Sequence, residues 1–193
     1  MNITRLLPIS EARLKVLFEI YSNKEDYLRN ISKDIKMNPS LTYKILKNLT
    51  KLNIVSKEEK GKEIVYTFEK SYDNILLRSI LEEYYLEKQI KKQLLLGTVV
   101  KLIRENKRLE CDRIFIFGSI LSGDFKKDSD IDILFVGGSK TEIINSCREI
   151  SSLVDRTLNP LIYTKEKFDK ELSSKEALID SIVNKIRSRV VVK

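Results

Sequence analysis

The stretch FGSILSGDFKKDSDIDILFV, residues 117–136, decides how this chain is interpreted. An apolar run that ends in Phe117 delivers Gly118 and Ser119, and Asp130 and Asp132 then occupy alternate positions of a second apolar run. Residues two apart on a strand point to the same face, so the two carboxylates would emerge together and could share Mg²⁺ or Mn²⁺. Gly118 lacks a Cβ and lets a phosphate approach the backbone, and Ser119 adds a hydroxyl and an amide donor. We therefore expect a phosphate and cation site here.

The composition limits the chemistry that is open to the chain. Lys and Arg outnumber Asp and Glu by 36 to 28, which predicts an anionic partner, and there is no histidine among the 193 residues. A Ser-His-Asp triad, a histidine general base and His-ligated zinc are therefore excluded within this chain. Cys111 and Cys147 are far apart in sequence and fit small core residues better than a disulfide or zinc site. Carboxylates and oxygen-bound metals must carry any reaction.

Length and hydropathy favour two small domains. The predicted fold class is α+β (mixed α/β), with a first domain over 1–70, a helical connector over 71–92 and a second domain over 93–193. No window holds eighteen apolar residues, and the first ten residues, MNITRLLPIS, lack the apolar stretch of a secretion signal. We expect a cytoplasmic protein with no membrane partner.

The first seventy residues predict three helices followed by a hairpin. The helices are expected at 10–22, with Ser10 as N-cap, at 27–36, and from about Ser40 to Leu52 with a buried stripe of Leu41, Ile45, Leu46 and Leu49. Two β-rich runs, NIVSKE and EIVYTFE, follow and are joined by the turn EKGKE, in which Gly61 can take a positive φ.

This order resembles the winged helix-turn-helix domains of small prokaryotic transcription regulators. Between Lys36 and Lys57 there are five lysines and no acidic residue, which suits a helix placed against double-stranded DNA. The expected phosphate contacts are Lys44, Lys47, Lys51, Lys60 and Lys62, and the residues expected near base edges are Ser40, Thr42, Tyr43 and Asn48. Winged-helix proteins often bind as pairs, so we expect a homodimer, formed through the first of two helices predicted between 72 and 107.

The second domain alternates strands and helices. Strands are expected at 113–117, 131–136, 158–164 and 190–192, with a helix at 142–154 and one or two helices between 165 and 186. The Gly-Ser corner would then lie at the end of the first strand, and the two aspartates on the next.

Gly-Ser followed by Asp-x-Asp resembles the signature of the polymerase-beta-type nucleotidyltransferases, and most closely that of their minimal members. The resemblance implies that Gly118 and Ser119 bind the triphosphate of a nucleotide, ATP being the first candidate, and that Asp130 and Asp132 ligate the metal ions. Two other phosphate or metal motifs fail on the residues. An EF-hand starting at Asp128 would need glycine at Ile133 and glutamate at Ser139, and the only Gly-Lys pair, Gly61-Lys62, lacks the rest of a P-loop.

The chain departs from this family pattern in two places. Active members usually carry a third acid on a later strand, where this chain has Asn159 in TLNPLIYT. Asparagine can coordinate a metal through its carbonyl but cannot act as a base. Asp155, Asp124 and Asp128 are the alternatives nearby in sequence. The residues ILSG after Ser119 also lack the arginine that minimal members often have there.

Two functions of different kinds follow. One is an enzyme that binds Mg-ATP and transfers a nucleoside monophosphate to a protein or nucleic-acid hydroxyl, with Asp130, Asp132 and Asn159 at its centre. The other is a transcription regulator whose second domain senses nucleotide without catalysis. Family resemblance alone adds a third, the antitoxin of a toxin–antitoxin pair that modifies its toxin partner.

Overall fold

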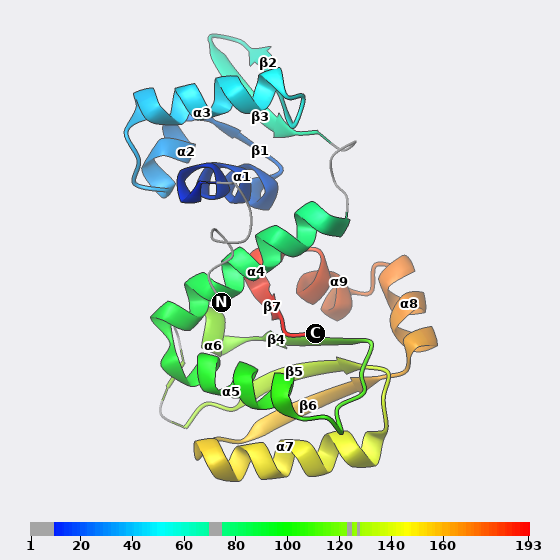
Figure 1. The fold of residues 1–193 in the computed structure, drawn as a ribbon. Helices are drawn as coiled ribbons and strands as arrows, with labels where there is room; N and C mark the ends of the chain where they lie inside the picture. Colours follow the sequence, from blue (N-terminus) through cyan, green and yellow to red (C-terminus); the bar gives the residue numbers. More distant parts are fainter. Residues whose placement is uncertain (1–9, 70–74, 123–124, 127) are drawn as a thin grey trace. The chain divides into compact units, whose positions relative to one another are not determined.

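The computed structural model describes residues 10–69, 75–122, 125–126 and 128–193. The chain divides into two compact units, residues 1–84 and 85–193, each of which is described separately (Figure 1). The division falls within the helix α4 (Ile75–Lys92). The mixed α/β class predicted from the sequence is confirmed. Within the described ranges, no helix combines the length and the apolar character that crossing a membrane requires.

The first unit contains three helices and a small antiparallel sheet with strand order β1-β3-β2. Its elements are α1 (Glu11–Asn23), β1 (Glu25–Tyr27), α2 (Leu28–Asp34), α3 (Pro39–Lys51), β2 (Val55–Lys60) and β3 (Glu63–Phe68). Ser10 caps α1 by accepting a hydrogen bond from the Arg13 amide, as expected. Asn38 caps α3 and Pro39 occupies its first turn, where the missing N–H costs nothing.

The strand β1 was not expected from the sequence. It pairs with β3 from Glu25–Thr67 to Tyr27–Val65, and so closes the sheet against the helices. Asp26 fixes the corner between β1 and α2, because its buried carboxylate accepts hydrogen bonds from Asn23, from Asn30 and from the Tyr27 amide. A three-residue strand has too little alternation to be recognised in a sequence.

The helix α3 turns a different face inward from the one predicted. Its buried residues are Thr42, Ile45, Leu46 and Leu49, while Leu41 is 46% exposed. The prediction that Leu41 belongs to the buried stripe is therefore wrong, and Thr42 takes its place. The Thr42 hydroxyl is satisfied inside the unit by donating to the Asn38 carbonyl.

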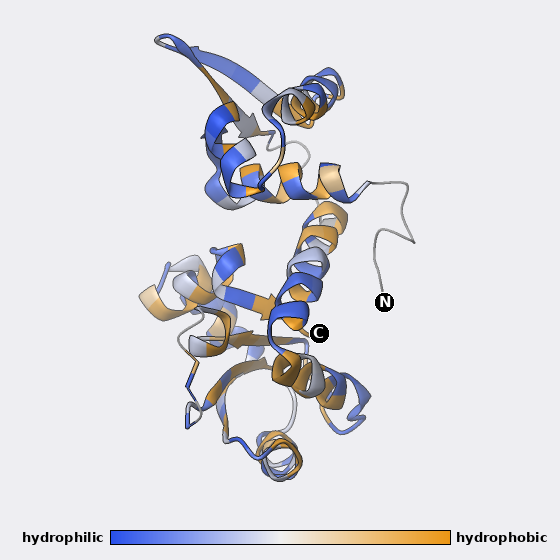
Figure 2. Cartoon of the chain, turned by 90° about the vertical axis from the view of Figure 1, so that its left-hand side faces the viewer, coloured by the Kyte–Doolittle hydropathy of each residue, from blue (hydrophilic) through white to orange (hydrophobic). Residues whose placement is uncertain are grey.

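The β2–β3 hairpin lies where two strands and a turn were predicted, although β2 begins and ends two residues later than the run NIVSKE. Gly61 lies at its tip with φ +68°, the left-handed region that favours glycine. After Val55 and Ser56 the rest of β2 is exposed, and this part of the hairpin is hydrophilic in Figure 2. Only the base of the hairpin contributes to the core.

The second unit is built on a four-stranded mixed sheet with order β6-β5-β4-β7, in which only the β5–β6 pair is parallel. The strands are β4 (Arg113–Phe117), β5 (Ile131–Val136), β6 (Leu158–Tyr163) and β7 (Arg189–Val191). The helices are α5 (Leu94–Glu105), α6 (Ser119–Ser122), α7 (Lys140–Val154), α8 (Lys165–Ser173) and α9 (Ala177–Val183), followed by a short 3-10 turn, η3 (Ile186–Ser188).

Each face of this sheet has its own core. One face packs against α8 and α9 through Phe115, Leu134, Tyr163, Phe168 and Ile182. The alternate residues of the same strands, among them Ile131 and Ile133, are fully buried on the other face, where α7 packs along β6 and against α5 (Figure 1). Both faces of β5 are buried along most of its length. Its one charged residue, Asp132, therefore lies near the start of the strand, where the cover is incomplete.

Ser146 on α7 provides a test of this packing. It is fully buried, and its hydroxyl has no hydrogen-bond partner among the described residues. Removing a buried hydroxyl that lacks a partner is favourable, and alanine also favours a helix more than serine does. We expect Ser146→Ala to raise the free energy of unfolding by about 1 kcal/mol, measured by urea denaturation.

Ser152→Ala, an exposed site on the same helix, is the matched control, and we expect it to change stability by only a few tenths of a kcal/mol. A loss of stability in Ser146→Ala would mean that the hydroxyl does stabilise the interior.

Candidate active site and nucleic-acid interface

The Gly-Ser corner and Asp132 meet at one end of the second sheet. In the strand register, Phe117 of β4 lies opposite Asp132 of β5, and Asp132 lies opposite Asn159 of β6. Side chains in one such row point to the same face. Asp132 therefore lies between Asn159 on one side and Phe117 on the other. Phe117 is followed directly by Gly118, so the Gly-Ser corner begins beside Asp132.

Gly118 is required at this corner for two reasons. Its φ is +81°, which side-chain-bearing residues rarely adopt, and a Cβ built on it would lie 2.5 Å from Asp132 Oδ2. Because Gly118 has no Cβ, the space next to Asp132 Oδ2 stays open. Ser119 then starts the single turn α6, where the first amides lack intrahelical acceptors.

Asn159 lies where the third acid was expected, and it is hydrogen-bonded to Asp132. Its amide nitrogen donates to Asp132 Oδ1 at 2.9 Å. The Asn159 carbonyl oxygen and Asp132 Oδ2 are the remaining oxygen atoms of this pair. Such oxygen donors suit a hard divalent cation such as Mg²⁺ or Mn²⁺.

Asp130 lies just before β5, which begins at Ile131, and its side chain is exposed. Among the described residues, neither Asp130 nor Asp132 belongs to a group of three acidic side chains whose oxygens lie within 4.8 Å of one another. Asp155 does not replace Asn159, because it ends α7 in the left-handed conformation with an exposed side chain. Asp128 is exposed in the preceding turn, and Asp124 lies outside the described residues.

Comparison with known proteins identifies the family of this unit. The family model described as "Nucleotidyltransferase domain" matches residues 98–188. A protein of Methanocaldococcus jannaschii named "Putative protein adenylyltransferase MJ0604" is 30% identical over 75 residues, which cover 38% of this chain and 75% of that protein. The chain belongs to the nucleotidyltransferase domain family.

Nucleotidyl transfer from a nucleoside triphosphate, with a divalent metal, is the general chemistry of this family. A solved structure of TrmBL2, an archaeal chromatin protein, is also similar, with 14% identity, a TM-score of 0.31, and coverage of 90% of this chain and 72% of that one. That similarity is too low to support an inference about fold or function.

The sequence analysis did not include Arg189 in the nucleotidyltransferase sheet, because it predicted that the last strand starts at residue 190. Arg189 of β7 lies opposite Phe117, in the same row as Asp132. It is only 3% exposed, and its guanidinium carbon lies 5.6 Å from the centre of the Phe115 ring, a cation–π contact. A buried arginine thus adds positive charge to the face that carries Asp132.

The residues predicted to contact DNA are partly brought together on α3. Ser40, Tyr43, Lys44 and Lys47 are exposed, and they line a shallow pocket of about 470 Å³. The other exposed candidates are Asn48 and Lys51 on the same helix, and Lys60 and Lys62 at the hairpin tip.

One of these candidates requires correction, and a second has a partner within the unit. Thr42 is fully buried, so it cannot reach a base edge. Lys60 forms an ion pair with Glu25 of β1, with a distance of 2.8 Å between Nζ and Oε2, and that hydrogen bond raises the pKa of the Lys60 ammonium. The hairpin also carries Glu58, Glu59 and Glu63, so its tip is less basic than α3.

A second group of carboxylates occurs in the first unit and was not predicted. Oxygens of Glu19, Asp26 and Asp34 lie within 4.8 Å of one another. Asn23 donates to both Glu19 and Asp26, and this amide is well placed to reduce their repulsion. The group is accounted for by its role in joining α1, β1 and α2.

Replacing Asn159 by aspartate tests the cation site. In Asn159→Asp a second carboxylate would face Asp132 where a hydrogen bond now lies, and we expect the metal-free protein to lose about 1–3 kcal/mol of stability at neutral pH. Repulsion raises the folded-state pKa of the pair, so the loss should shrink as pH falls toward the unfolded-state pKa of about 4. Mg²⁺ should raise the melting temperature of the variant more than that of the wild type.

Asn159→Ala is the matched control, since it removes the hydrogen bond without adding charge. Thermal melts with and without Mg²⁺ compare the three proteins. If Mg²⁺ stabilises Asn159→Asp no more than Asn159→Ala, this end of the sheet does not hold the cation.

Proposed function

We propose that the chain transfers a nucleoside monophosphate from a nucleoside triphosphate, with ATP the first candidate, to a hydroxyl group of a protein. The observation that carries the proposal is the meeting of Gly118, Asp132 and Asn159 at one end of a sheet. The match of residues 98–188 to the nucleotidyltransferase domain supports the reaction class, and the name of the archaeal relative supports a protein acceptor.

In the proposed reaction the acceptor oxygen forms a bond to the α-phosphorus. The bond from that phosphorus to the oxygen bridging to the β-phosphate breaks, and pyrophosphate leaves. The acceptor proton passes to an aspartate carboxylate or to water, since the chain has no histidine. A cation held by Asp130 and Asp132 would screen the charge of the phosphates. Gly118 would admit the triphosphate close to the backbone, and Ser119 would donate hydrogen bonds to it.

A second candidate function is nucleotide sensing without transfer. It is favoured by Asn159 in place of a third carboxylate and by the absence of arginine in ILSG after Ser119. Both features reduce the charge available for the transition state while leaving a nucleotide site intact.

The pair Asp130→Asn and Asp132→Asn, made together, distinguishes these functions. Asparagine keeps the shape of each side chain and removes its charge, so the fold should survive. We expect transfer of label from α-³²P-ATP to fall roughly a hundredfold or more, assayed with Mg²⁺ on the chain itself and on a random copolymer of glutamate and tyrosine.

Circular dichroism of the double variant serves as the control for folding. Label transfer that survives the double substitution contradicts the assigned roles. A wild-type protein that binds Mg-ATP and labels neither acceptor favours the sensing function.

We further propose that the first unit is a winged helix-turn-helix domain that binds double-stranded DNA. The order α1-β1-α2-α3-β2-β3 with a three-stranded antiparallel sheet supports this assignment. Lys44, Lys47 and Lys51 are exposed on α3, and residues 36–57 contain no carboxylate side chain. A helix of this kind suits the major groove, and its lysines suit the flanking phosphates. Homodimerisation and a toxin partner stay predictions.

The salt dependence of DNA binding tests this interface. Each lysine that neutralises a phosphate contributes about one unit to the slope of log affinity against log salt. We expect Lys44→Ala with Lys47→Ala to weaken binding to a fluorescent duplex and to reduce that slope by about two, measured by anisotropy between about 50 and 200 mM salt.

Lys165→Ala with Lys170→Ala on α8, two exposed lysines of the nucleotidyltransferase unit, is the charge-matched control. An unchanged slope in the α3 double variant, or an equal change in the control, would place the DNA contacts elsewhere.

A further inference from the structure

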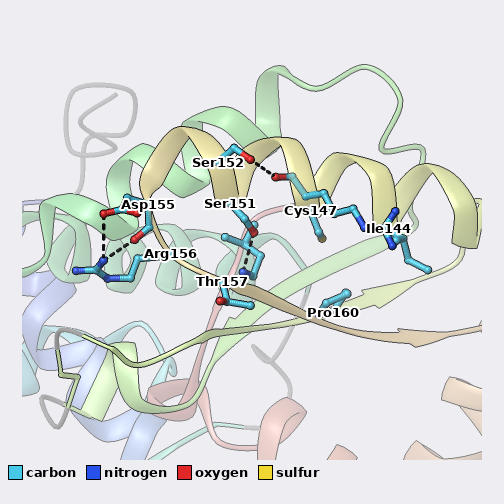
Figure 3. Close-up of a pocket in the computed structure, with 10 residues that line it drawn as sticks. Ile144, Cys147, Ser151, Ser152, Asp155, Arg156, Thr157 and Pro160 are labelled. Carbon is cyan, nitrogen blue, oxygen red and sulfur yellow. Dashed lines mark hydrogen bonds and ion pairs between the residues drawn. The ribbon is translucent and has the colours of Figure 1, made fainter.

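A groove of about 630 Å³ lies between α7 and the edge strand β6 (Figure 3). Its apolar part is formed by Ile144, Cys147, Leu158 and Pro160, and its polar part by Arg148, Ser151, Ser152, Asp155, Arg156 and Thr157. Figure 3 shows Ser151 and Cys147 on α7 facing the segment that runs from Arg156 through Thr157 to Pro160. Such a mixture of an apolar floor and a few polar groups is typical of a binding site.

The backbone of β6 is closed to strand addition along this groove. The Leu158 amide donates to Ser151 Oγ at 2.9 Å, and Pro160 has no amide hydrogen. The Ile131 amide donates to the Thr157 carbonyl and the Gly137 amide to the Tyr163 carbonyl, so the odd-numbered residues of this strand face β5. The backbone groups of the even-numbered residues therefore face away from β5. Two of these residues, Leu158 and Pro160, have no free amide hydrogen to offer to an added strand. An occupant must be recognised by side chains and not as an added strand.

The charge of the groove is positive. Arg148 is exposed and has no ion pair among the described residues, and the next residue, Glu149, is bound by Arg108 through two hydrogen bonds. Arg156 donates to the Asp155 carbonyl and lies 4.0 Å from the Asp155 carboxylate in an ion pair, and its side chain is 25% exposed. The Arg156 Nε is buried and has no hydrogen-bond partner within the described part of the chain. Two guanidinium groups against one carboxylate favour an acidic occupant.

Thiol chemistry does not account for this groove. Cys147 is 3% exposed, and burial raises the pKa of its thiol to about 11, so the reactive thiolate is rare at neutral pH. The cysteine contributes apolar surface to the floor. The groove is therefore better suited to binding than to reaction.

The groove adjoins the candidate active site across a single strand. Leu158 and Pro160 line the groove, and Asn159 between them turns to the other face of β6 and donates to Asp132. Successive residues of a strand point to opposite faces, and β6 is an edge of the sheet. A polypeptide held in the groove needs to pass only over this edge to bring a hydroxyl to Asp132.

We propose that this groove binds the protein acceptor through an acidic segment, whose carboxylates pair with Arg148 and Arg156 and whose acceptor hydroxyl lies a few residues away. This rests on the proposed transfer to a protein, although binding to the groove can be measured without transfer. The acceptor is identified by its chemistry, a polypeptide with carboxylates next to a hydroxyl.

The test uses the full chain and the fluorescently labelled copolymer of glutamate and tyrosine, without nucleotide. We expect Arg148→Glu to weaken binding of the copolymer roughly three- to tenfold by anisotropy, and the combination of Arg148→Glu with Arg156→Gln to weaken it further. In the transfer assay, Arg148→Glu should raise the KM for the copolymer with little change in kcat, since it removes binding remote from the reacting atoms.

Lys170→Glu on α8 and Lys92→Glu on α4 are the matched charge reversals, both at exposed sites. A copolymer that does not bind the wild type, or that loses as much affinity in either control as in Arg148→Glu, overturns the proposal. Groove binding that survives without any transfer activity would count against the proposed reaction alone. Transfer to the copolymer that is indifferent to Arg148 would count against the groove alone.

Discussion

The position of Asp132 in the register of three strands is the constraint on which the candidate site depends. Asp132 lies between Phe117 and Asn159, and the residues before and after it are fully buried isoleucines. A slip of one residue in either ladder would turn the carboxylate into the core and expose an isoleucine, which the apolar packing on both faces of β5 opposes. The packing energy of the sheet thus fixes the one charged side chain of that strand at its open end.

The hydrogen bond from Asn159 decides how this site behaves without a cation. Two facing carboxylates would repel each other, and one would tend to take up a proton. An amide opposite Asp132 instead satisfies one carboxylate oxygen and leaves the other beside the open space at Gly118. The arrangement is ordered before any ligand arrives, but its smaller negative charge must attract a cation less strongly than a triad of acids would. Compared with an acidic residue at the same position, Asn159 therefore lowers the expected affinity for a cation and stabilises the metal-free fold.

Several elements were predictable because their signals are local. Strands at Arg113–Phe117 and Ile131–Val136 follow from apolar runs bounded by glycine and aspartate, and their ends agree with the structure. The error on α3 was one of phase: at 100° per residue Thr42 lies at the centre of the stripe formed by Ile45, Leu46 and Leu49, whereas Leu41 lies about 90° away from that centre. The polarity of threonine concealed a position that helical geometry alone would have given.

Other features depend on contacts between distant residues, which periodicity does not contain. The ion pair of Lys60 required β1, a strand too short to be foreseen, because Glu25 lies on it. The hydrogen bond between Asn159 and Asp132 required the parallel pairing of β5 with β6, and the groove required the packing of α7 along that same edge. The sequence showed which residue types could form a site, whereas the pairing of strands determined which of them meet.

The absence of histidine places a further demand on the proposed reaction. Asn159 cannot accept a proton, so the acceptor hydroxyl must lose its proton to Asp130, to Asp132 or to water. A carboxylate is a weak base, with an ordinary pKa near 4, and a phenol with a pKa near 10 is far easier for it to deprotonate than an aliphatic alcohol. The same carboxylates would also bind the cation, which makes them weaker bases still. Under the proposed transfer, a site of this composition would favour a tyrosine hydroxyl over that of serine or threonine, through proton transfer and not through the shape of a pocket.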